Sequence, residues 1–594
     1  MCFAKSRWSR DVRLDMNLVI RQYLASLRER GELDAILPDL LSQMGLVVFS
    51  RPRRGTRQDG VDVGAVGRIG DGEEKVYLFS IKAGDLARKE WDGDVQALRQ
   101  SLTAILDVYI RNRLPVEHRD KPIVVCICLG GDVREEVRPD LVAFIEKHKS
   151  SAVSFEEWNG DRLAREIQGA LLREELLPPG SRSNLRKALA LLDEPQSSFA
   201  HFKALIRSLA APHNAPTAAQ ITAIRQMSLC LRILFGWCRE AGNSEAAFLA
   251  AELTLLHGWV IVRDFLTKQS REAENVLTAF LSIYEAYQEI CGSFLKEYVV
   301  PHVAKLHGLS SAVGSPCGLD VNLKLFDLIG RVGVTGLWTF WAANRVKEEQ
   351  SEEWAQMLEQ TERLAQVIKA MIANNPTLLM PATEGQAIDV ALALLLLGLD
   401  GRNAGDIRAW LHEMVNRTGF ALRSHSAYPC RLTSYIEFLE HPKRQDDDYR
   451  KKVTAGSVLF PLIALWAALL GDHDLYAEVA ELRQEILSHC TFQYWYPDET
   501  SEAHLYAGDQ LHGATLTNVC VDRPQAALLD QLFSECDATP HFEELTAVKY
   551  GWWPIVAVAC RHHRLPLPLH LLKPLRPQEA GTAGAGASVD QESS

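Results

Sequence analysis

The sequence predicts an α+β (α/β) N-terminal domain, in which helices flank a central mixed sheet, followed by a large all-α domain. β-branched runs alternate with helical patterns from Leu46 to about Trp158, and strand signals nearly vanish beyond residue 184. The length points the same way, because a single domain rarely grows beyond about 250–300 residues and this chain has 594.

Five segments of the N-terminal region have the β-branched, apolar character of strands. They are residues 47–49, 61–67, 75–82, 122–130 and 152–158. The glycine-rich stretch GRIGDGEE joins the second and third segments and suits the turn of a hairpin. We therefore expect these two strands to be antiparallel neighbours.

Two helices are predicted around these strands from apolar residues spaced three and four apart. The first precedes the strands and is marked by Ile36, Leu37, Leu40, Leu41 and Met44. Gly45 is placed to end it. The second lies between the third and fourth strands and is marked by Val95, Leu98, Leu102, Ile105, Leu106 and Tyr109. The predicted order is helix, three strands, helix, strand, and then a further helix and strand.

The predicted domains are residues 1–176, a linker at 177–184, a helical domain at 185–576 and a disordered tail at 577–594. LPPGSRSN has the composition of a linker, and the tail is small and polar. The longest apolar run, Gly456 to Gly471, contains Pro461. It is shorter than the roughly 20 residues that span a bilayer, so it predicts a buried helix.

Charge and motifs exclude several classes of protein. The net charge is −12, but residues 1–180 carry 28 basic and 29 acidic side chains, so the acidity lies in the helical part. That part is therefore a poor candidate for holding DNA by charge. The chain has neither a G-x-x-x-x-G-K-[ST] phosphate loop nor a G-x-S-x-G elbow. It also has no C-x-x-C pair and no visible signal peptide, so we expect reduced thiols and a cytoplasmic protein.

One group of residues has the side chains that a catalytic site needs. Asp62 lies between Val61 and Val63 in an apolar strand, where a carboxylate is costly unless it is paired or binds a cation. Twenty residues later Lys82 ends the third strand, and alternation places Ser80 on the same face as Lys82. A hairpin of the two strands would bring Asp62, Ser80 and Lys82 together.

This pattern resembles the PD-(D/E)XK nuclease superfamily, most closely its restriction-endonuclease-like members of the Mrr type. In those proteins a G-[VI]-D strand precedes a Q-x-K or E-x-K strand; here the strands carry Asp62 and Ser80-Ile81-Lys82. The resemblance covers the N-terminal domain only. It implies that Asp62 is a ligand of Mg²⁺ (or Mn²⁺) and that Lys82 positions the attacking water. The implied function is a metal-dependent DNA endonuclease with a helical regulatory domain, of the kind found in restriction and antiviral (anti-phage) defence.

Ser80 departs from this pattern, because the family usually has Glu, Asp or Gln there and a hydroxyl is a weaker Mg²⁺ ligand than a carboxylate. Three interpretations stay open. Ser80 holds a metal-bound water while another acid supplies the charge; the site cuts weakly until it is activated; or the fold is catalytically degenerate and serves as a nucleic-acid-binding or protein-interaction scaffold. The candidate acids are Glu32, Asp34, Glu90, Asp92 and Asp94.

Further residues are candidates for contacts with the substrate. The resemblance implies that Gln96, on the helix after the third strand, faces the phosphate; a solvent-facing position is the alternative. A basic loop before Asp62 suits phosphate contacts, although a solvated surface loop would look the same. Its arginines are Arg51, Arg53, Arg54 and Arg57. DNA is the expected substrate, with RNA as the alternative.

The helical domain gives weaker signals. Residues 492–513 are dense in aromatic and polar groups, and they form either a pocket or a long loop packed by its own aromatics. The side chains that would line such a pocket are Tyr494, Trp495, Glu502, His504 and His512. We expect this domain to bind a protein partner or to self-associate, without contact to a membrane.

Overall fold

The protein is described here from a computed structural model. The described residues are 33–51, 59–70, 72–93, 97–170, 179–210, 215–346, 351–444, 446–508 and 515–576, together with 20, 21, 23–25, 27 and 29. The chain divides into two compact units, Met1–Ile290 and Cys291–Ser594. The predicted tail at 577–594 lies outside the described residues.

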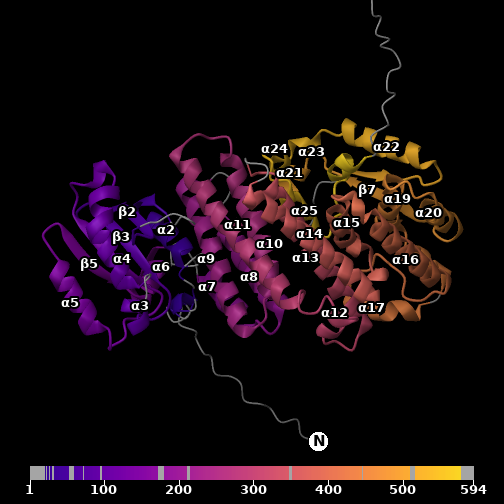
Figure 1. The fold of residues 1–594 in the computed structure, drawn as a ribbon. Helices are drawn as coiled ribbons and strands as arrows, with labels where there is room; N and C mark the ends of the chain where they lie inside the picture. Colours follow the sequence, from indigo (N-terminus) through magenta and orange to yellow (C-terminus); the bar gives the residue numbers. More distant parts are fainter. Residues whose placement is uncertain are drawn as a thin grey trace, which may run out of the picture. The chain divides into compact units, whose positions relative to one another are not determined.

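The first unit begins with a five-stranded mixed sheet in the order β1-β2-β3-β4-β5 (indigo and violet in Figure 1). Its strands are β1 (Val47–Ser50), β2 (Val63–Gly67), β3 (Lys75–Lys82), β4 (Ile123–Leu129) and β5 (Val153–Trp158). β1, β2 and β3 pair antiparallel, whereas β3, β4 and β5 pair parallel. The five predicted strands and the mixed sheet are thus confirmed. Several boundaries differ by one residue, and β2 begins two residues later than predicted, so Asp62 lies just before it instead of inside it.

Helices flank this sheet, as predicted. They are α2 (Asp34–Gln43), α3 (Arg88–Asp92), α4 (Leu98–Ala104), the π-helix η2 (Ile105–Arg113), the 3-10 turn η3 (Val116–His118), α5 (Arg138–His148) and α6 (Gly160–Ala170). α3, α4, η2 and α5 share one apolar core with β3 and β4, in which Leu78 and Val125 are fully buried. Gly45 has a φ of 89° directly after α2, which is the expected helix stop.

The rest of the first unit is helical. Its helices are α7 (Pro179–Ala190), α8 (Pro195–Leu209), α9 (Thr217–Ala241), α10 (Glu245–Val262), the 3-10 turn η4 (Arg263–Phe265) and α11 (Arg271–Tyr298), which extends past the unit boundary. Residues 179–184, expected in a linker, form the first turns of α7. Gln43 of α2 bonds both Thr222 and Arg225 of α9, so these helices contact the sheet domain directly.

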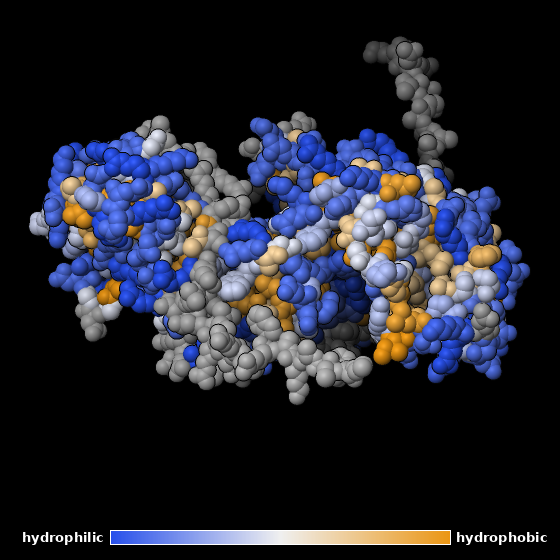
Figure 2. All heavy atoms as spheres, turned by 90° about the horizontal axis from the view of Figure 1, so that it is seen from below, coloured by the Kyte–Doolittle hydropathy of each residue, from blue (hydrophilic) through white to orange (hydrophobic). Residues whose placement is uncertain are grey.

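One stretch, Glu245–Phe265, is long and apolar enough to cross a membrane, but most of it is buried inside the protein. The face drawn in Figure 2 is mainly hydrophilic, with apolar side chains in separate groups. The stretch is therefore a core helix in this structure.

The second unit is mainly helical (Figure 1, magenta through orange to yellow). Its α-helices are α12 (Gly308–Ala312), α13 (Gly318–Ala343), α14 (Glu352–Asn374), α15 (Ala387–Gly398), α16 (Ala404–Arg423), α17 (Tyr435–Glu440), α18 (Asp447–Val453), α19 (Leu459–Leu469), α20 (His473–Glu485), α21 (Ser501–His504), α22 (Gln525–Ala538), α23 (His541–Glu544), α24 (Thr546–Lys549) and α25 (Pro554–His563). Short 3-10 turns are η5 (Pro376–Leu379), η6 (Glu384–Gln386), η7 (Gly401–Asn403), η8 (His441–Lys443) and η9 (Leu569–Leu575). Every residue of α19 is buried, as predicted for the longest apolar run.

Glycines let α13 pack closely against α15. A Cβ at Gly333 would lie 2.9 Å from the backbone carbon of Leu392, and one at Gly336 would lie 2.3 Å from the Leu396 side chain. Only hydrogen fits at these positions, so the two helices come together at backbone distance.

A small three-stranded sheet interrupts the helices of the second unit and corrects the expectation that this part is entirely helical. Its strands are β6 (Gly456–Ser457), β7 (Thr491–Tyr496) and β8 (Thr515–Asn518). β7 carries the sequence TFQYWY, whose β-branched and aromatic residues favour a strand. The loop interpretation of this segment was therefore wrong for Thr491–Tyr496.

Candidate active site

A tight turn fixes the chain just before Asp62. Gly60 has a φ of 84°, and a Cβ there would lie 2.1 Å from the backbone oxygen of Ser101. The neighbouring Asp59 is almost fully buried and pairs with Arg113, with 2.6 Å between Oδ2 and Nε. The turn is thereby held against the α4–η2 helix, which sets where the next residues enter the sheet.

Asp62 is bound to β3 through both its backbone and its side chain. Its N–H donates to the carbonyl oxygen of Phe79 at 2.8 Å, and its Oδ2 accepts the backbone N–H of Ile81, also at 2.8 Å. In a regular antiparallel ladder the Ile81 N–H would donate to a backbone carbonyl, but here it donates to the Asp62 carboxylate. The regular pairing of β2 therefore begins at Val63, one residue after Asp62. The predicted meeting of Asp62 with the end of β3 is confirmed.

Lys82, the last residue of β3, forms an ion pair with Glu29. Its Nζ lies 3.0 Å from Oε2 of Glu29, and the Lys82 and Glu29 side chains are 11% and 31% exposed. Sequence reasoning missed Glu29 because it looked for the acid at other positions, namely Glu32, Asp34, Glu90, Asp92 and Asp94. The buried residues Ile20, Leu24 and Leu27 have the three- and four-residue spacing of one helix face. This pattern ends close to Glu29 and is the signal from which its segment could have been included among the candidates.

Burial raises the pKa of Asp62 to about 6. The Ile81 N–H opposes this rise in pKa, and so does the positive charge of Lys82, whereas the carboxylates of Glu29 and Asp34 add to it. Asp34, at the start of α2, is thus one of the charges that act on Asp62. We call these three carboxylates and the lysine that act on one another the acidic corner (Glu29, Asp34, Asp62 and Lys82).

The other catalytic candidates have different positions. Ser80 is buried within β3 and offers a hydroxyl where the family pattern has an acid or amide. Asp92 is paired with Arg99 instead, with 2.7 Å between Oδ2 and Nη1. Glu90 lies on the same short helix as Asp92, α3. Gln96, Glu32 and Asp94 lie outside the described residues.

Arg51 takes part in a second group of charges. Asp39 of α2 is buried, which raises its pKa, and Arg225 of α9 and then Arg51 oppose the rise. Arg51 is itself exposed, so its charge acts both on Asp39 and toward solvent. The other predicted phosphate contacts, Arg53, Arg54 and Arg57, lie outside the described residues.

Among the described residues, no group of three or more His, Cys, Asp or Glu side chains is placed to hold a metal ion. The donor chemistry of the acidic corner nevertheless fits a hard cation, because carboxylate oxygens are the ligands that Mg²⁺ prefers and it needs few of them from a protein. Glu29 is engaged by Lys82 in this structure. Glu29 would have to exchange Lys82 for the cation to complete such a site.

Comparisons with protein-family models, with curated proteins and with solved structures found no match to this chain.

Proposed function

We propose that residues 1–176 form a PD-(D/E)XK-like nuclease domain that hydrolyses phosphodiester bonds of DNA with Mg²⁺ or Mn²⁺. The observation that carries the proposal is the convergence of Asp62 and Lys82 with a third residue, Glu29, at one end of β3. An isolated buried carboxylate is costly, and a fold keeps one at a site where its charge is used.

Each residue of the acidic corner has a role in this proposal. Asp62 and Glu29 would hold the divalent cation, which when bound lowers the pKa of a coordinated water and stabilises charge on the phosphate, and Asp34 would add negative charge beside them. The Ile81 N–H fixes the orientation of the Asp62 carboxylate. Lys82, released from Glu29, would hold the attacking water or a phosphate oxygen. The basic loop, Arg51 with Arg53, Arg54 and Arg57, would hold the flanking phosphates.

The acidic helical remainder of the chain has the charge of a regulatory region and not of a DNA-binding one. We propose that it controls cleavage through a protein partner or through self-association, as in restriction or anti-phage defence. This cellular role rests on analogy with other nucleases fused to large helical regions.

The test is cleavage of supercoiled and linear DNA by the full-length protein with Mg²⁺ or Mn²⁺. Asp62→Asn keeps the acceptor for the Ile81 N–H but removes the charge, and Lys82→Met removes the cation. We expect each to lower the cleavage rate by at least about 100-fold, as losses of one charge-stabilising group do in other active sites. Cleavage of an RNA of the same sequence would identify the alternative substrate.

The chain offers matched controls at the other end of β3. Lys121 and Glu74 form an ion pair there, with 2.8 Å between Nζ and Oε2. Lys121→Met and Glu74→Gln should cleave like the unmodified protein. Cleavage that survives both Asp62→Asn and Lys82→Met would show that the activity belongs to another site or to a contaminant.

A second candidate function is a catalytically inactive domain that binds nucleic acid or serves as an interaction scaffold. It is favoured by the buried Ser80 in place of an acid and by the engagement of Lys82 with Glu29. DNA binding that depends on Asp62 or on the basic loop, with no cleavage under any metal, would support this candidate over the nuclease.

A further inference from the structure

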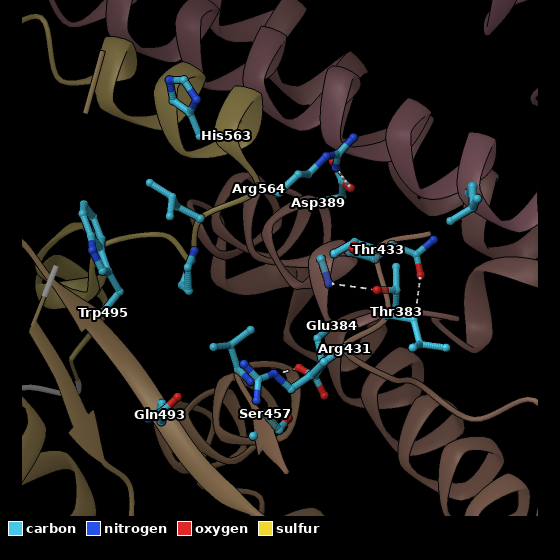
Figure 3. A pocket seen from close by; sticks show the side chains of 18 of the residues that line it. Thr383, Glu384, Asp389, Arg431, Thr433, Ser457, Gln493, Trp495, His563 and Arg564 are labelled. Atoms are coloured by element: carbon cyan, nitrogen blue, oxygen red, sulfur yellow. Dashed lines mark hydrogen bonds and ion pairs between the residues drawn. The ribbon is translucent and has the colours of Figure 1, made fainter. Parts of the chain in front are cut away.

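A cavity of about 770 Å³ lies inside the second unit (Figure 3). Its wall combines seven segments: α13, the start of α15 with η6, the residues after Cys430, α17, β6, β7 and the end of α25 with the residues after it. This size is typical of sites that enclose a small organic ligand. The residues that line the cavity are distinct from the acidic corner, so a ligand site here does not depend on the proposed nuclease function.

One side of the cavity is bounded by a buried ion-pair cluster. Asp327 contacts Arg331 at 2.7 Å and Arg561 at 2.5 Å, and Asp389 contacts Arg564 at 2.5 Å. Lys324 is a further cation near Asp327, at 3.7 Å. The cluster reaches the cavity through Asp389 and Arg564, which line it, and the Arg564 side chain is 43% exposed.

A second arginine enters from another segment. Arg431 is exposed and lines the cavity, and no ion pair or hydrogen bond of its side chain is found among the described residues. Its Nη1 and Oε1 of Gln493 lie 3.6 Å and 3.7 Å from the point where a Cβ on Gly456 would stand. In Figure 3 the Arg431 side chain extends beside Ser457 toward Gln493, whereas Arg564 turns toward Asp389.

The nearby Glu384 has hydrogen-bond partners of its own. Its Oε2 accepts the backbone N–H groups of Val458 at 2.9 Å and Leu459 at 3.0 Å, at the N-terminus of α19. Burial raises the pKa of Glu384, whereas these bonds and the charge of Arg431 lower it. Arg431 forms no ion pair with Glu384 among the described residues, so its exposed guanidinium is open to an anion from solution.

A buried donor also lines the cavity without a partner. Trp495 is 1% exposed, and its indole N–H has no acceptor among the described residues. A ligand with a hydrogen-bond acceptor would satisfy it. Gln493 supplies both a donor and an acceptor beside it, and Leu323, Phe438 and Leu565 supply apolar surface.

We propose that this cavity binds a nucleotide-sized organic phosphate. Its phosphate pairs with Arg431 on the side toward Gln493, and Arg564 is a second cation in the wall of the cavity. Its uncharged ring system fills the apolar part, with an acceptor atom on the Trp495 N–H. Arginine suits this role because its planar fork binds phosphate oxygens in pairs. An inorganic phosphate ion would leave most of the volume empty.

The test is calorimetric titration of the full-length protein with the four ribonucleoside 5′-monophosphates and the four 5′-triphosphates. Adenosine and inorganic phosphate serve as fragment probes. We expect at least one nucleotide to bind saturably at one site per chain and to bind at least tenfold more tightly than either fragment. Arg431→Gln should weaken this binding at least tenfold, Arg431→Lys should weaken it less, and Trp495→Phe should weaken it severalfold.

Matched controls lie outside the cavity. Arg417 is an exposed arginine of α16 paired with Glu413, and Trp466 of α19 is a buried tryptophan whose indole N–H also lacks an acceptor among the described residues. Arg417→Gln and Trp466→Phe should bind like the unmodified protein. The proposal is overturned if no nucleotide binds, if inorganic phosphate binds as tightly as any nucleotide, or if Arg431→Gln binds as tightly as the unmodified protein.

Discussion

Two aspartates, one in each unit, have a pKa that burial raises to about 6, yet their surroundings are opposite in charge. Asp62 of the first unit shares its corner with two further carboxylates, Glu29 and Asp34, and with Lys82 as the cation. Asp389 of the second unit is fully buried beside Arg564 and Arg561.

The difference separates a buried ion network from the place where we propose that a cation binds. Asp389 is held by arginines, with Arg564 at 2.5 Å and Arg561 at 3.9 Å, so it already has cationic partners. Around Asp62 the carboxylates of Glu29 and Asp34 raise its pKa, and Lys82, which lowers it, pairs with Glu29. A divalent cation near Asp62 would stabilise its ionised form.

The largest effect on stability is predicted for the removal of a buried cation from the ion network around Asp327 and Asp389. Arg561 is 2% exposed and bonds Asp327 at 2.5 Å. Arg561→Met keeps much of the volume but leaves buried carboxylates short of a partner. We expect it to lower the free energy of unfolding by about 3–5 kcal/mol, as for other buried pairs that lose one member. Urea denaturation followed by fluorescence measures this change.

The control for that prediction is an exposed pair in the same unit. Arg363 and Glu359 are paired across one turn of α14 and are both more than half exposed. Arg363→Met should change stability by less than about 1 kcal/mol. If Arg561→Met and Arg363→Met had equal effects, the network would not be a structural element of the second unit.

The second prediction is a gain in stability, and it concerns Asp62. Its pKa is higher in the folded protein than the usual 3.8, so the folded state holds this proton at a pH where the unfolded chain releases it. Above pH 6 the ionised Asp62 therefore lowers stability, and the penalty disappears as the pH falls toward 4. Asp62→Asn should stabilise the protein at pH 8 by up to about 3 kcal/mol, from 1.36 kcal/mol per pKa unit.

Thermal or urea unfolding of both proteins between pH 4 and pH 8 checks this prediction. Glu74→Gln is the control, because Lys121 lowers the pKa of Glu74 and its removal should give no stabilisation at pH 8. A loss of stability in Asp62→Asn at pH 8 would mean that the charge is already compensated and that the two aspartates are alike.

Much of the first unit could be predicted from the sequence because its signals are local. β-branched runs marked all five strands, and the glycine-rich connection marked the hairpin that brings Asp62 to the end of β3. Alternation along a strand is a property of the backbone, so the relation of Ser80 to Lys82 needed no knowledge of the tertiary structure.

The parts that could not be predicted depend on contacts between distant segments. Glu29 is 53 residues from Lys82, and only the docking of its segment against the sheet makes them partners. The cavity of the second unit draws on residues from Leu323 to Pro566, none of which forms a motif by itself. The strand β7 was missed because its aromatic residues suit a packed loop as well as a sheet, and pairing with β8 decides between the two.

The smallest predicted effect tests whether the acids of the first unit act on one another. Glu29 raises the pKa of Asp62, so removing the charge of Glu29 should make an ionised Asp62 less costly. Asp62→Asn should then stabilise less in a Glu29→Gln background than in the unmodified protein, by about 0.5–1 kcal/mol at pH 8. A double-mutant cycle from urea denaturation at pH 8 measures this coupling, and its repetition at pH 4 should give no coupling because Asp62 is then protonated. An equal effect of Asp62→Asn in both backgrounds would mean that Glu29 serves only as the partner of Lys82 and would remove it from the set of candidate metal ligands. A coupling that is present at pH 8 and that a divalent cation abolishes would be the signature of an acidic corner in which the cation replaces Lys82 at Glu29.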